Sequence, residues 1–180
     1  EKEEILNQSG LPFRVFTPYK RAWLEKANEA MPILPTITSL QSPKLHGQFD
    51  LSNVKGFDDV DEASGEVAAR KQLQSFIKRK ATTYKENRDF PFVDGTSKLS
   101  AALSVGVISI RQAYWAAHEA KSLANKRERE NIETFISELV WREFYYQILA
   151  NFPYVTERSF KDDFVDLKWS NNEKHFAAWC

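Results

Sequence analysis

The side chains best suited to chemistry lie in one stretch, residues 135–146, which reads F-I-S-E-L-V-W-R-E-F-Y-Y. Its apolar spacing predicts a helix. Positions i, i+3, i+4 and i+7 share one face of a helix. Here they carry a carboxylate, an indole, a guanidinium and a phenol, with a phenylalanine beside them: Glu138, Trp141, Arg142, Tyr145 and Phe135. Such a face could hold a flat, anionic aromatic ligand or a nucleobase.

A plainer interpretation of this face stays open. Glu138 and Arg142 could form an ordinary i,i+4 pair, which stabilises a helix by about 0.2–0.5 kcal/mol. Trp141 could be a core residue. The opposite side of the helix carries an aliphatic and aromatic row that predicts core packing: Ile132, Ile136, Val140 and Phe144. The crowding of polar and aromatic groups opposite this row favours a functional site.

A second candidate is G-T-S-K-L-S at residues 95–100, which follows a turn at Asp94 and Gly95. Free backbone N–H groups at a helix start carry partial positive charge and attract phosphate. Three hydroxyls and a lysine add further donors. The alternative is an ordinary Ser/Thr cap after a glycine turn. The spacing is not that of a P-loop.

Isolated aromatic and charged residues give weaker signals. Tyr84 and Arg88 could join a phosphate site, or they could be a tyrosine at the core edge and a solvated arginine. Trp169 and Trp179 can equally be packing residues. The aspartates at 162–166 lack the glycine and late glutamate of a calcium loop, and the three histidines are scattered. We therefore expect no metal site.

Composition narrows the class of protein. The 180 residues suffice for one domain with a core. Lys plus Arg and Asp plus Glu number 25 each, so any DNA-binding charge must be a local patch. Cys180 is the single cysteine, which excludes an intrachain disulfide and favours a reducing, cytoplasmic location. No stretch approaches the roughly 20 apolar residues of a membrane span.

The periodicity predicts an all-α chain in two parts. Residues 1–65 hold five of the seven prolines and are expected to form an irregular linker with one short helix at about 18–30. Residues 66–180 are expected to be helical. The first helix there should run to about Asn87, Ser109 should cap a later one, the long helix should span about 128–150, and Asn172 should cap the last.

Taken together, five ordered blocks resemble the DNA photolyase/cryptochrome family, and in particular class I cyclobutane pyrimidine dimer photolyases. The blocks span nearly the whole chain, at residues 13–23 (F-R-V-F-T-P-Y-K-R-A-W), 84–91 (Y-K-E-N-R-D-F-P), 95–100, 137–145 (S-E-L-V-W-R-E-F-Y) and 169–180 (W-S-N-N-E-K-H-F-A-A-W-C).

The resemblance implies that this chain is an internal piece of a longer protein. It would comprise the inter-domain linker, residues 1–65, and the N-terminal part of the helical FAD-binding and DNA-binding domain, residues 66–180. An antenna chromophore would belong to a domain that this piece lacks. The parent protein is expected to be a monomer, whereas the isolated piece could self-associate through exposed apolar faces.

The resemblance also implies roles for particular residues. FAD contacts are expected at Tyr84, Thr96, Ser97, Lys98, Leu99, Ser100, Phe135 and Arg142. Phe135 stands where many relatives have tryptophan. Contacts to DNA or to the damaged bases are expected at Arg88, Glu138, Trp141, Arg142 and Tyr145. Glu138 would touch the base edge of the dimer, Trp141 would pack against it, and Trp169 would be the outermost tryptophan of the chain that photoreduces the flavin.

The activity so implied is light-driven splitting of pyrimidine dimers in UV-damaged DNA by an electron from excited, reduced FAD. Two alternatives stay open. The parent could be a cryptochrome, a blue-light photoreceptor that signals without repair. The 180-residue piece could also be inactive alone, because part of its flavin site and core would be missing.

Overall fold

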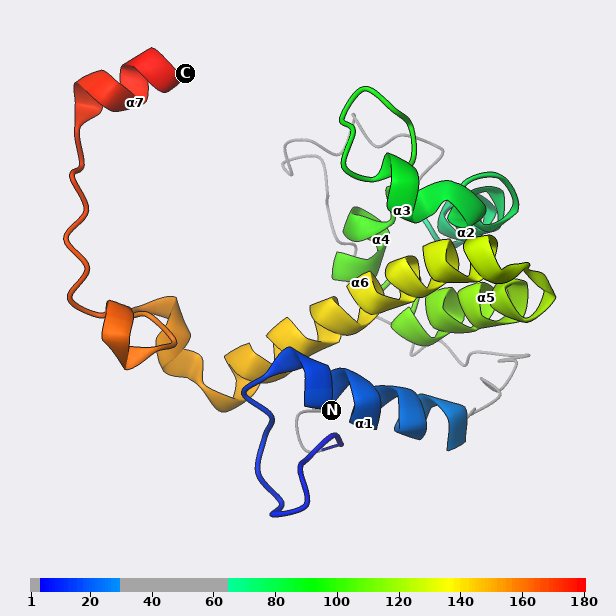
Figure 1. Cartoon of the computed structure of the whole chain (residues 1–180), viewed down its shortest axis with the longest axis horizontal. Helices are drawn as coiled ribbons and strands as arrows, with labels where there is room; N and C mark the ends of the chain where they lie inside the picture. The colour runs from blue at the N-terminus through cyan, green and yellow to red at the C-terminus, as the bar shows by residue number, and fades with distance from the viewer. Residues whose placement is uncertain (1–3, 30–64) are drawn as a thin grey trace, which may run out of the picture. The chain divides into compact units, whose positions relative to one another are not determined.

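The computed structural model describes residues 4–29 and 65–180, and in these ranges the regular structure is helical apart from one isolated bridge between Leu6 and Pro12. The prediction of an all-α fold is therefore confirmed. The helices are α1 (Phe16–Glu29), α2 (Glu66–Arg79), η1 (Ala81–Thr83), α3 (Tyr84–Asn87), α4 (Ser100–Ser104), α5 (Ile110–Leu123), α6 (Lys126–Asn151), η2 (Pro153–Thr156), η3 (Asp162–Phe164) and α7 (Glu173–Trp179) (Figure 1).

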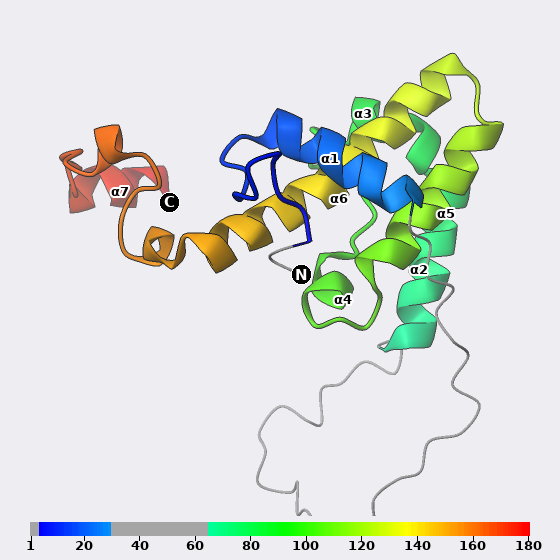
Figure 2. The ribbon, with the colours of Figure 1, turned by 90° about the horizontal axis from the view of Figure 1, so that it is seen from below.

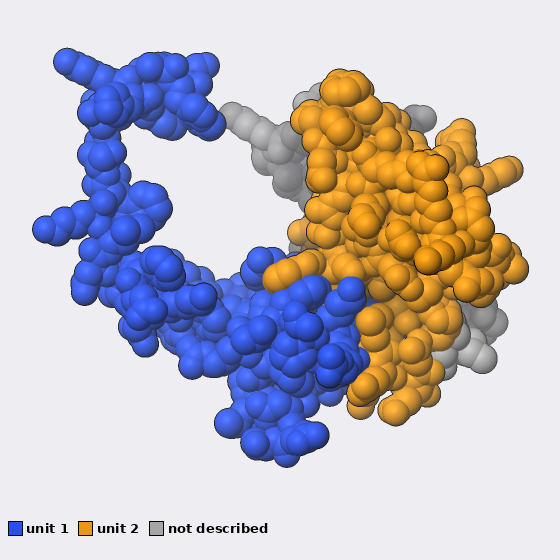
Figure 3. Space-filling model, viewed as in Figure 1, with its two compact units in different colours: residues 1–23, 143–180 blue, residues 24–142 orange. Residues whose placement is uncertain are grey.

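The chain divides into two compact units (Figure 3). Unit 1 is Glu1–Trp23 with Glu143–Cys180, and unit 2 is Leu24–Arg142. The predicted division at residue 65 stays a prediction, because residues 30–64 lie outside the described part.

Helix starts follow their capping residues. Ser109 accepts a hydrogen bond from the backbone N–H of Gln112, whose side chain accepts from the Ser109 N–H, and α5 begins there. Asn125 and Glu128 make the same reciprocal pair before α6. Asn172 accepts from two backbone N–H groups at the start of α7. The caps predicted at Ser109 and Asn172 are confirmed.

Helix α2 is shorter than predicted. We expected one helix to about Asn87, but α2 ends at Arg79, Lys80 has φ −130°, and η1 and α3 follow. After this break the hydrogen bonds differ from those of a continuous helix. In a continuous helix the Lys85 N–H would donate to the Ala81 carbonyl, whereas here it donates to Asn131 Oδ1 on α6 at 2.8 Å. Thr83 Oγ1 also donates to the Lys80 carbonyl, which competes with regular helix.

The core of unit 2 forms where α2, α3, α5 and the first half of α6 meet. Helices α2 and α5 pack on each other, and Figures 1 and 2 show both beside α6. Phe76 of α2 packs on Phe135 of α6 with ring centroids 4.6 Å apart. Lys121 of α5 pairs with Glu133 of α6 at 2.9 Å. The row predicted as core on α6 is confirmed, since Ile132, Ile136, Val140 and Phe144 are all buried.

Unit 1 has a separate aromatic core. Tyr19 of α1 is buried against Phe13 and Phe144, with ring centroids 6.0 and 5.3 Å away. The buried Gln147 donates from Nε2 to the Phe13 carbonyl at 2.8 Å, which ties the N-terminal segment to α6. Aromatic rings and a hydrogen bond between segments more than 130 positions apart thus help to hold unit 1 together.

Asn131 should be the polar residue on which unit 2 depends most. Its Oδ1 accepts from Lys85, and its Nδ2 donates to the Arg127 carbonyl at 3.0 Å. Asn131→Ala would leave the partly buried Lys85 N–H without this acceptor, at a cost of about 1–3 kcal/mol. Urea unfolding of the chain should show a loss of this size. Thr134→Ala, at a half-buried position of the same helix where the hydroxyl donates to the Glu130 carbonyl one turn earlier, should change stability by no more than about 0.5 kcal/mol, and equal losses in both variants would contradict the role.

Candidate functional site

The side chains predicted to form the functional face of α6 differ in how far they are buried. Phe135 is 3% exposed and belongs to the core. Glu138, Trp141 and Arg142 are half-buried. Tyr145 is 62% exposed and falls in unit 1, whereas the other four belong to unit 2. The part of the face that unit 2 can present therefore consists of Glu138, Trp141 and Arg142.

Glu138 forms an ion pair with Arg88, fifty positions earlier in the chain. Arg88 Nη1 donates to Glu138 Oε1 at 2.5 Å, and Arg88 Nε donates to Asp89 Oδ1 at 3.3 Å. The hydrogen bond from Arg88 to Glu138 raises the pKa of Arg88, so the guanidinium is permanently charged. The structure thus joins two residues that the sequence suggested separately, one for DNA and one for the damaged base.

Tyr84 sits directly beside this pair. Its ring is buried and packs edge-on against Phe76 and Phe135, with centroids 5.7 and 5.4 Å away. The Arg88 guanidinium lies over the ring, 5.6 Å from its centroid. Burial raises the pKa of the Tyr84 phenol, against a lowering by Arg88. Tyr84 is therefore a neutral, fixed ring that carries a cation on its face.

The segment 94–100 is held from outside by Lys80 and Gln72. Asp94 accepts from Lys80 at 2.6 Å and pairs with Lys98 at 3.0 Å, and these hydrogen bonds lower the pKa of Asp94. Gln72 Nε2 donates to the carbonyls of Ser97 and Lys98, both at 2.9 Å. Sequence reasoning missed Gln72, because a glutamine on a helix surface carries no local signal of its distant partner.

Gly95 is required by a close approach of the chain to α3. A Cβ at this position would lie 2.5 Å from the Cβ of Asn87, far inside contact distance. Lys98 has φ 52°, in the left-handed region that non-glycine residues rarely adopt. Together with the bonds to Gln72 and Asp94, these features fix the turn that leads into α4.

The donors at this turn fit a phosphate or a polyol. Thr96 and Ser97 are half-buried, Lys98 and Ser100 are exposed, and Leu99 is buried in the core. The set offers hydroxyls, a lysine and the first N–H groups of α4. Leu99 can supply only its backbone, since its side chain is packed away. Arg142 lies near the end of α4, where its Nη2 donates to the Leu103 carbonyl at 2.8 Å.

Trp169 and Trp179 lie in the C-terminal part of unit 1. Trp169 is 75% exposed in a segment without helix, and Trp179 is exposed at the end of α7. Trp179 meets the ring of Phe176 on the same helix, with ring centroids 6.1 Å apart. In the described residues, no group of three or more His, Cys, Asp or Glu is placed to hold a metal ion, and no helix has the length and apolar character needed to cross a membrane.

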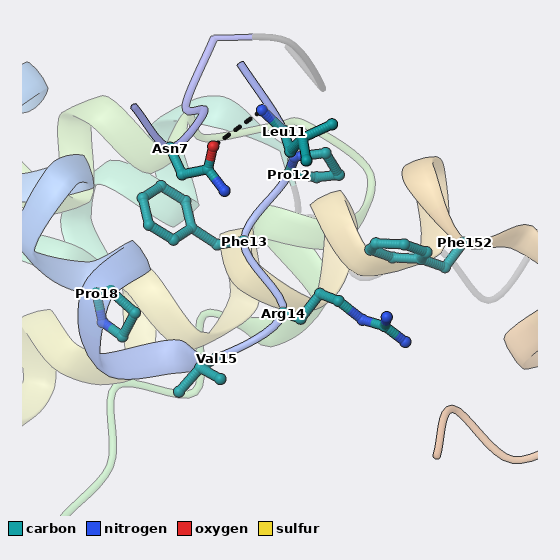
Figure 4. A pocket seen from close by; sticks show the side chains of 8 residues that line it. All are labelled: Asn7, Leu11, Pro12, Phe13, Arg14, Val15, Pro18 and Phe152. Atoms are coloured by element: carbon teal, nitrogen blue, oxygen red, sulfur yellow. Dashed lines mark hydrogen bonds between the residues drawn. The ribbon is translucent and has the colours of Figure 1, made fainter. Parts of the chain in front are cut away.

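Unit 1 also contains a pocket of about 500 Å³ (Figure 4). Its lining is mostly apolar, with Arg14 at its edge, where the guanidinium lies 5.3 Å from the ring centroid of Phe152. The lining residues are Asn7, Leu11, Pro12, Phe13, Arg14, Val15, Pro18 and Phe152. None of the residues predicted to bind FAD or DNA contributes to it.

Comparison with known proteins identifies the class to which the helical site belongs. Residues 135–180 match the family described as the FAD binding domain of DNA photolyase. A crystal structure of a bacterial class III photolyase from Agrobacterium tumefaciens superposes with a TM-score of 0.77 at 34% identity, and covers 99% of this chain and 38% of that one.

Curated relatives agree along the whole chain. A deoxyribodipyrimidine photo-lyase from Agrobacterium fabrum is 36% identical over 99% of this chain, and one from Alkalihalophilus pseudofirmus is 31% identical over 99%. The chain spans 38–39% of the length of these relatives. The chain belongs to the DNA photolyase family, as the five sequence blocks predicted. Its assignment to class I within that family stays a prediction.

Burial of Tyr84 has a consequence at high pH. The folded pKa of this phenol lies above its unfolded value of about 10. The buried, neutral phenol therefore makes its full contribution to the free energy of unfolding below pH 10, and this contribution is lost as the pH rises through the folded pKa. Tyr84→Phe should leave the free energy of unfolding near pH 7 almost unchanged and should make its decline above pH 10 less steep. Urea unfolding at pH 7 to 11 measures this, and an unchanged alkaline slope would contradict it.

Proposed function

We propose that this chain is part of a light-driven DNA-repair enzyme that splits cyclobutane pyrimidine dimers with FAD as its cofactor. The observation that carries the proposal is the contact set of Tyr84, Arg88 and Glu138. It joins a residue expected at the flavin, one expected at DNA and one expected at the damaged base. The relatives named deoxyribodipyrimidine photo-lyase support the same activity.

FAD would be held mainly by the turn before α4. Thr96, Ser97 and Ser100 would donate hydroxyl hydrogen bonds to the phosphates or the ribityl chain, and Lys98 would add charge. The backbone at Leu99 would contribute with them. Tyr84 and Phe135 would form the ring wall behind the cofactor, and Arg142 would contact it from α6. The match of residues 135–180 to a FAD-binding domain includes Phe135 and Arg142 and supports their part in this assignment.

The damaged DNA would meet the face made by Glu138 and Trp141. A pyrimidine dimer stacks poorly, so turning it out of the duplex costs less than for a normal base. Trp141 would pack against its apolar surface and Glu138 would bond its base edge, while Arg88, Arg142 and Tyr145 would contact the adjoining DNA. Phosphate contacts would position the protein, and the pocket would select the lesion.

Bound FAD would supply the light-driven electron that splits the dimer. The side chains of this chain would orient the lesion, exclude water and fix the charges around it. Trp169 would relay an electron toward the flavin from the solvent side, and its 75% exposure is compatible with an outermost position. The antenna chromophore is proposed to bind a different part of the parent protein.

The oligomeric state and the location of the protein are also proposed from sequence. We propose a cytoplasmic parent that is monomeric. The isolated 180-residue chain would self-associate, because its C-terminal segment exposes several large apolar side chains: Phe164, Leu167, Trp169, Phe176 and Trp179.

Gly95→Ala should reduce flavin retention, because the added Cβ would meet Asn87 and shift the turn that carries the proposed donors. The parent protein would be purified, loaded with FAD and passed through gel filtration, and the flavin retained would be read from its absorption spectrum. We expect a loss of at least severalfold. Gly106→Asn is the matched control: φ there is 75°, which asparagine tolerates, and the site is open. Equal retention in both variants would contradict the proposed cradle.

Glu138→Gln should separate cofactor binding from repair. The amide keeps the shape of the side chain but loses the charge that Arg88 contacts, so flavin retention should stay unchanged. The yield of dimer splitting under near-UV light should fall by about tenfold, the size expected when one hydrogen bond to a charged group is lost. An unchanged yield would refute the role of Glu138. If the unmodified parent binds FAD but repairs no dimers, the cryptochrome alternative would replace repair.

A further inference from the structure

We propose that Arg88 is a positioning residue that fixes the carboxylate of Glu138 for recognition of the lesion, in addition to any contact it makes with DNA phosphate. This inference rests on the proposed function of Glu138. It adds a specific role for Arg88: the guanidinium determines how well the protein discriminates damaged from undamaged DNA, not merely how tightly it binds DNA in general.

The geometry of the pair carries the proposal. Arg88 follows α3 and Glu138 lies on α6, so the 2.5 Å hydrogen bond joins two separate elements. The side chains are 29% and 38% exposed. Fully exposed ion pairs contribute little, because each side chain loses rotational freedom and water screens the charges. Here the half-buried setting reduces that screening.

The guanidinium is itself held in place. It lies over the buried Tyr84 ring at 5.6 Å, and its Nε donates to Asp89. Tyr84 is in turn fixed against Phe76 and Phe135. A glutamate side chain on a helix surface would otherwise sample several rotamers, which costs free energy when one must be selected on binding. Because the Arg88 guanidinium is fixed, Glu138 already occupies one rotamer before DNA binds.

The bond to Arg88 leaves Glu138 able to take a second partner. An ionised carboxylate has two oxygens and about four acceptor positions, and Arg88 contacts Oε1. A donor N–H on the edge of an extruded base can therefore be accepted while the ion pair persists. In this arrangement Glu138 acts as an acceptor, and the proposed lesion class is one that presents an N–H on its base edge.

A simple phosphate contact predicts a different outcome. Phosphates carry no sequence or lesion information, so loss of such a contact weakens binding to damaged and undamaged duplexes equally and lowers the salt dependence of binding. Loss of a positioning residue instead weakens the damaged complex selectively. The ratio of the two dissociation constants separates these roles.

The test uses the flavin-loaded parent protein and one duplex, with and without a single thymine dimer. Dissociation constants would be measured in the dark for wild type, Arg88→Ala, Arg88→Lys, Glu138→Ala and the Arg88→Ala/Glu138→Ala double variant. We expect Arg88→Ala to lower the discrimination ratio by about tenfold, and Arg88→Lys to restore part of it. In the Glu138→Ala background, Arg88→Ala should have little further effect on the ratio, since coupled residues are not additive.

Arg127→Ala is the matched control. Arg127 also makes a hydrogen-bonded pair with a glutamate, donating to Glu86 from Nε at 2.8 Å and from Nη2 at 2.9 Å, but it is exposed and is not one of the residues proposed to contact DNA or the lesion. Its loss should leave the ratio unchanged. The absorption of bound FAD checks that each variant is folded. If Arg88→Ala does not fold, the comparison is made with Arg88→Lys instead.

Three results would overturn the inference. Equal weakening of both duplexes by Arg88→Ala would reduce Arg88 to a phosphate contact. An undiminished effect of Arg88→Ala in the Glu138→Ala background would mean that it acts independently of Glu138. A ratio unaffected by Glu138→Ala would mean that there is no base contact to position. The last result also refutes the proposed role of Glu138, whereas the first two leave the repair function intact.

Discussion

The hydrogen bond from the Lys85 N–H to the Asn131 side chain is the contact on which the site depends. It satisfies the Lys85 N–H at the start of α3 and holds that helix against α6, after α2 has ended at Arg79. Tyr84 then reaches Phe135, and Arg88 reaches Glu138. An uninterrupted helix would direct successive side chains around its axis at 3.6 residues per turn. One buried amide therefore anchors the short helix that begins at Tyr84 and that Arg88 follows.

Sequence reasoning succeeded where the signal was local. The caps at Ser109 and Asn172 and the buried row on α6 follow from residue types a few positions apart. It failed at the end of α2, because the partner that holds the next helix, α3, is 46 positions away. It also proposed Glu138 and Arg88 for separate contacts without detecting their pairing. A contact between distant segments has no periodicity, so only the family resemblance placed these residues in one site.

The charged side chains at the site form ion pairs with one another. Arg88 lies between Glu138 and Asp89, and Lys98 shares Asp94 with Lys80. Arg88 and Lys98 are thus already engaged with carboxylates. A phosphate that approaches must compete with these pairs, which lowers the net gain from each contact but favours ligands that place charge in the correct geometry. Zero net charge for the chain is consistent with recognition of this kind.

The boundary between the two compact units falls inside α6, between Arg142 and Glu143. Domains that recombine or are expressed separately are usually divided at exposed linkers. A cut here would instead sever a continuous hydrogen-bonded ladder, leaving unpaired carbonyls on one piece and unpaired N–H groups on the other. The two units are therefore not independent modules. Successful chimeras between relatives should place their crossover in the connection before Lys126 or after Asn151, so that the whole of α6 comes from one parent.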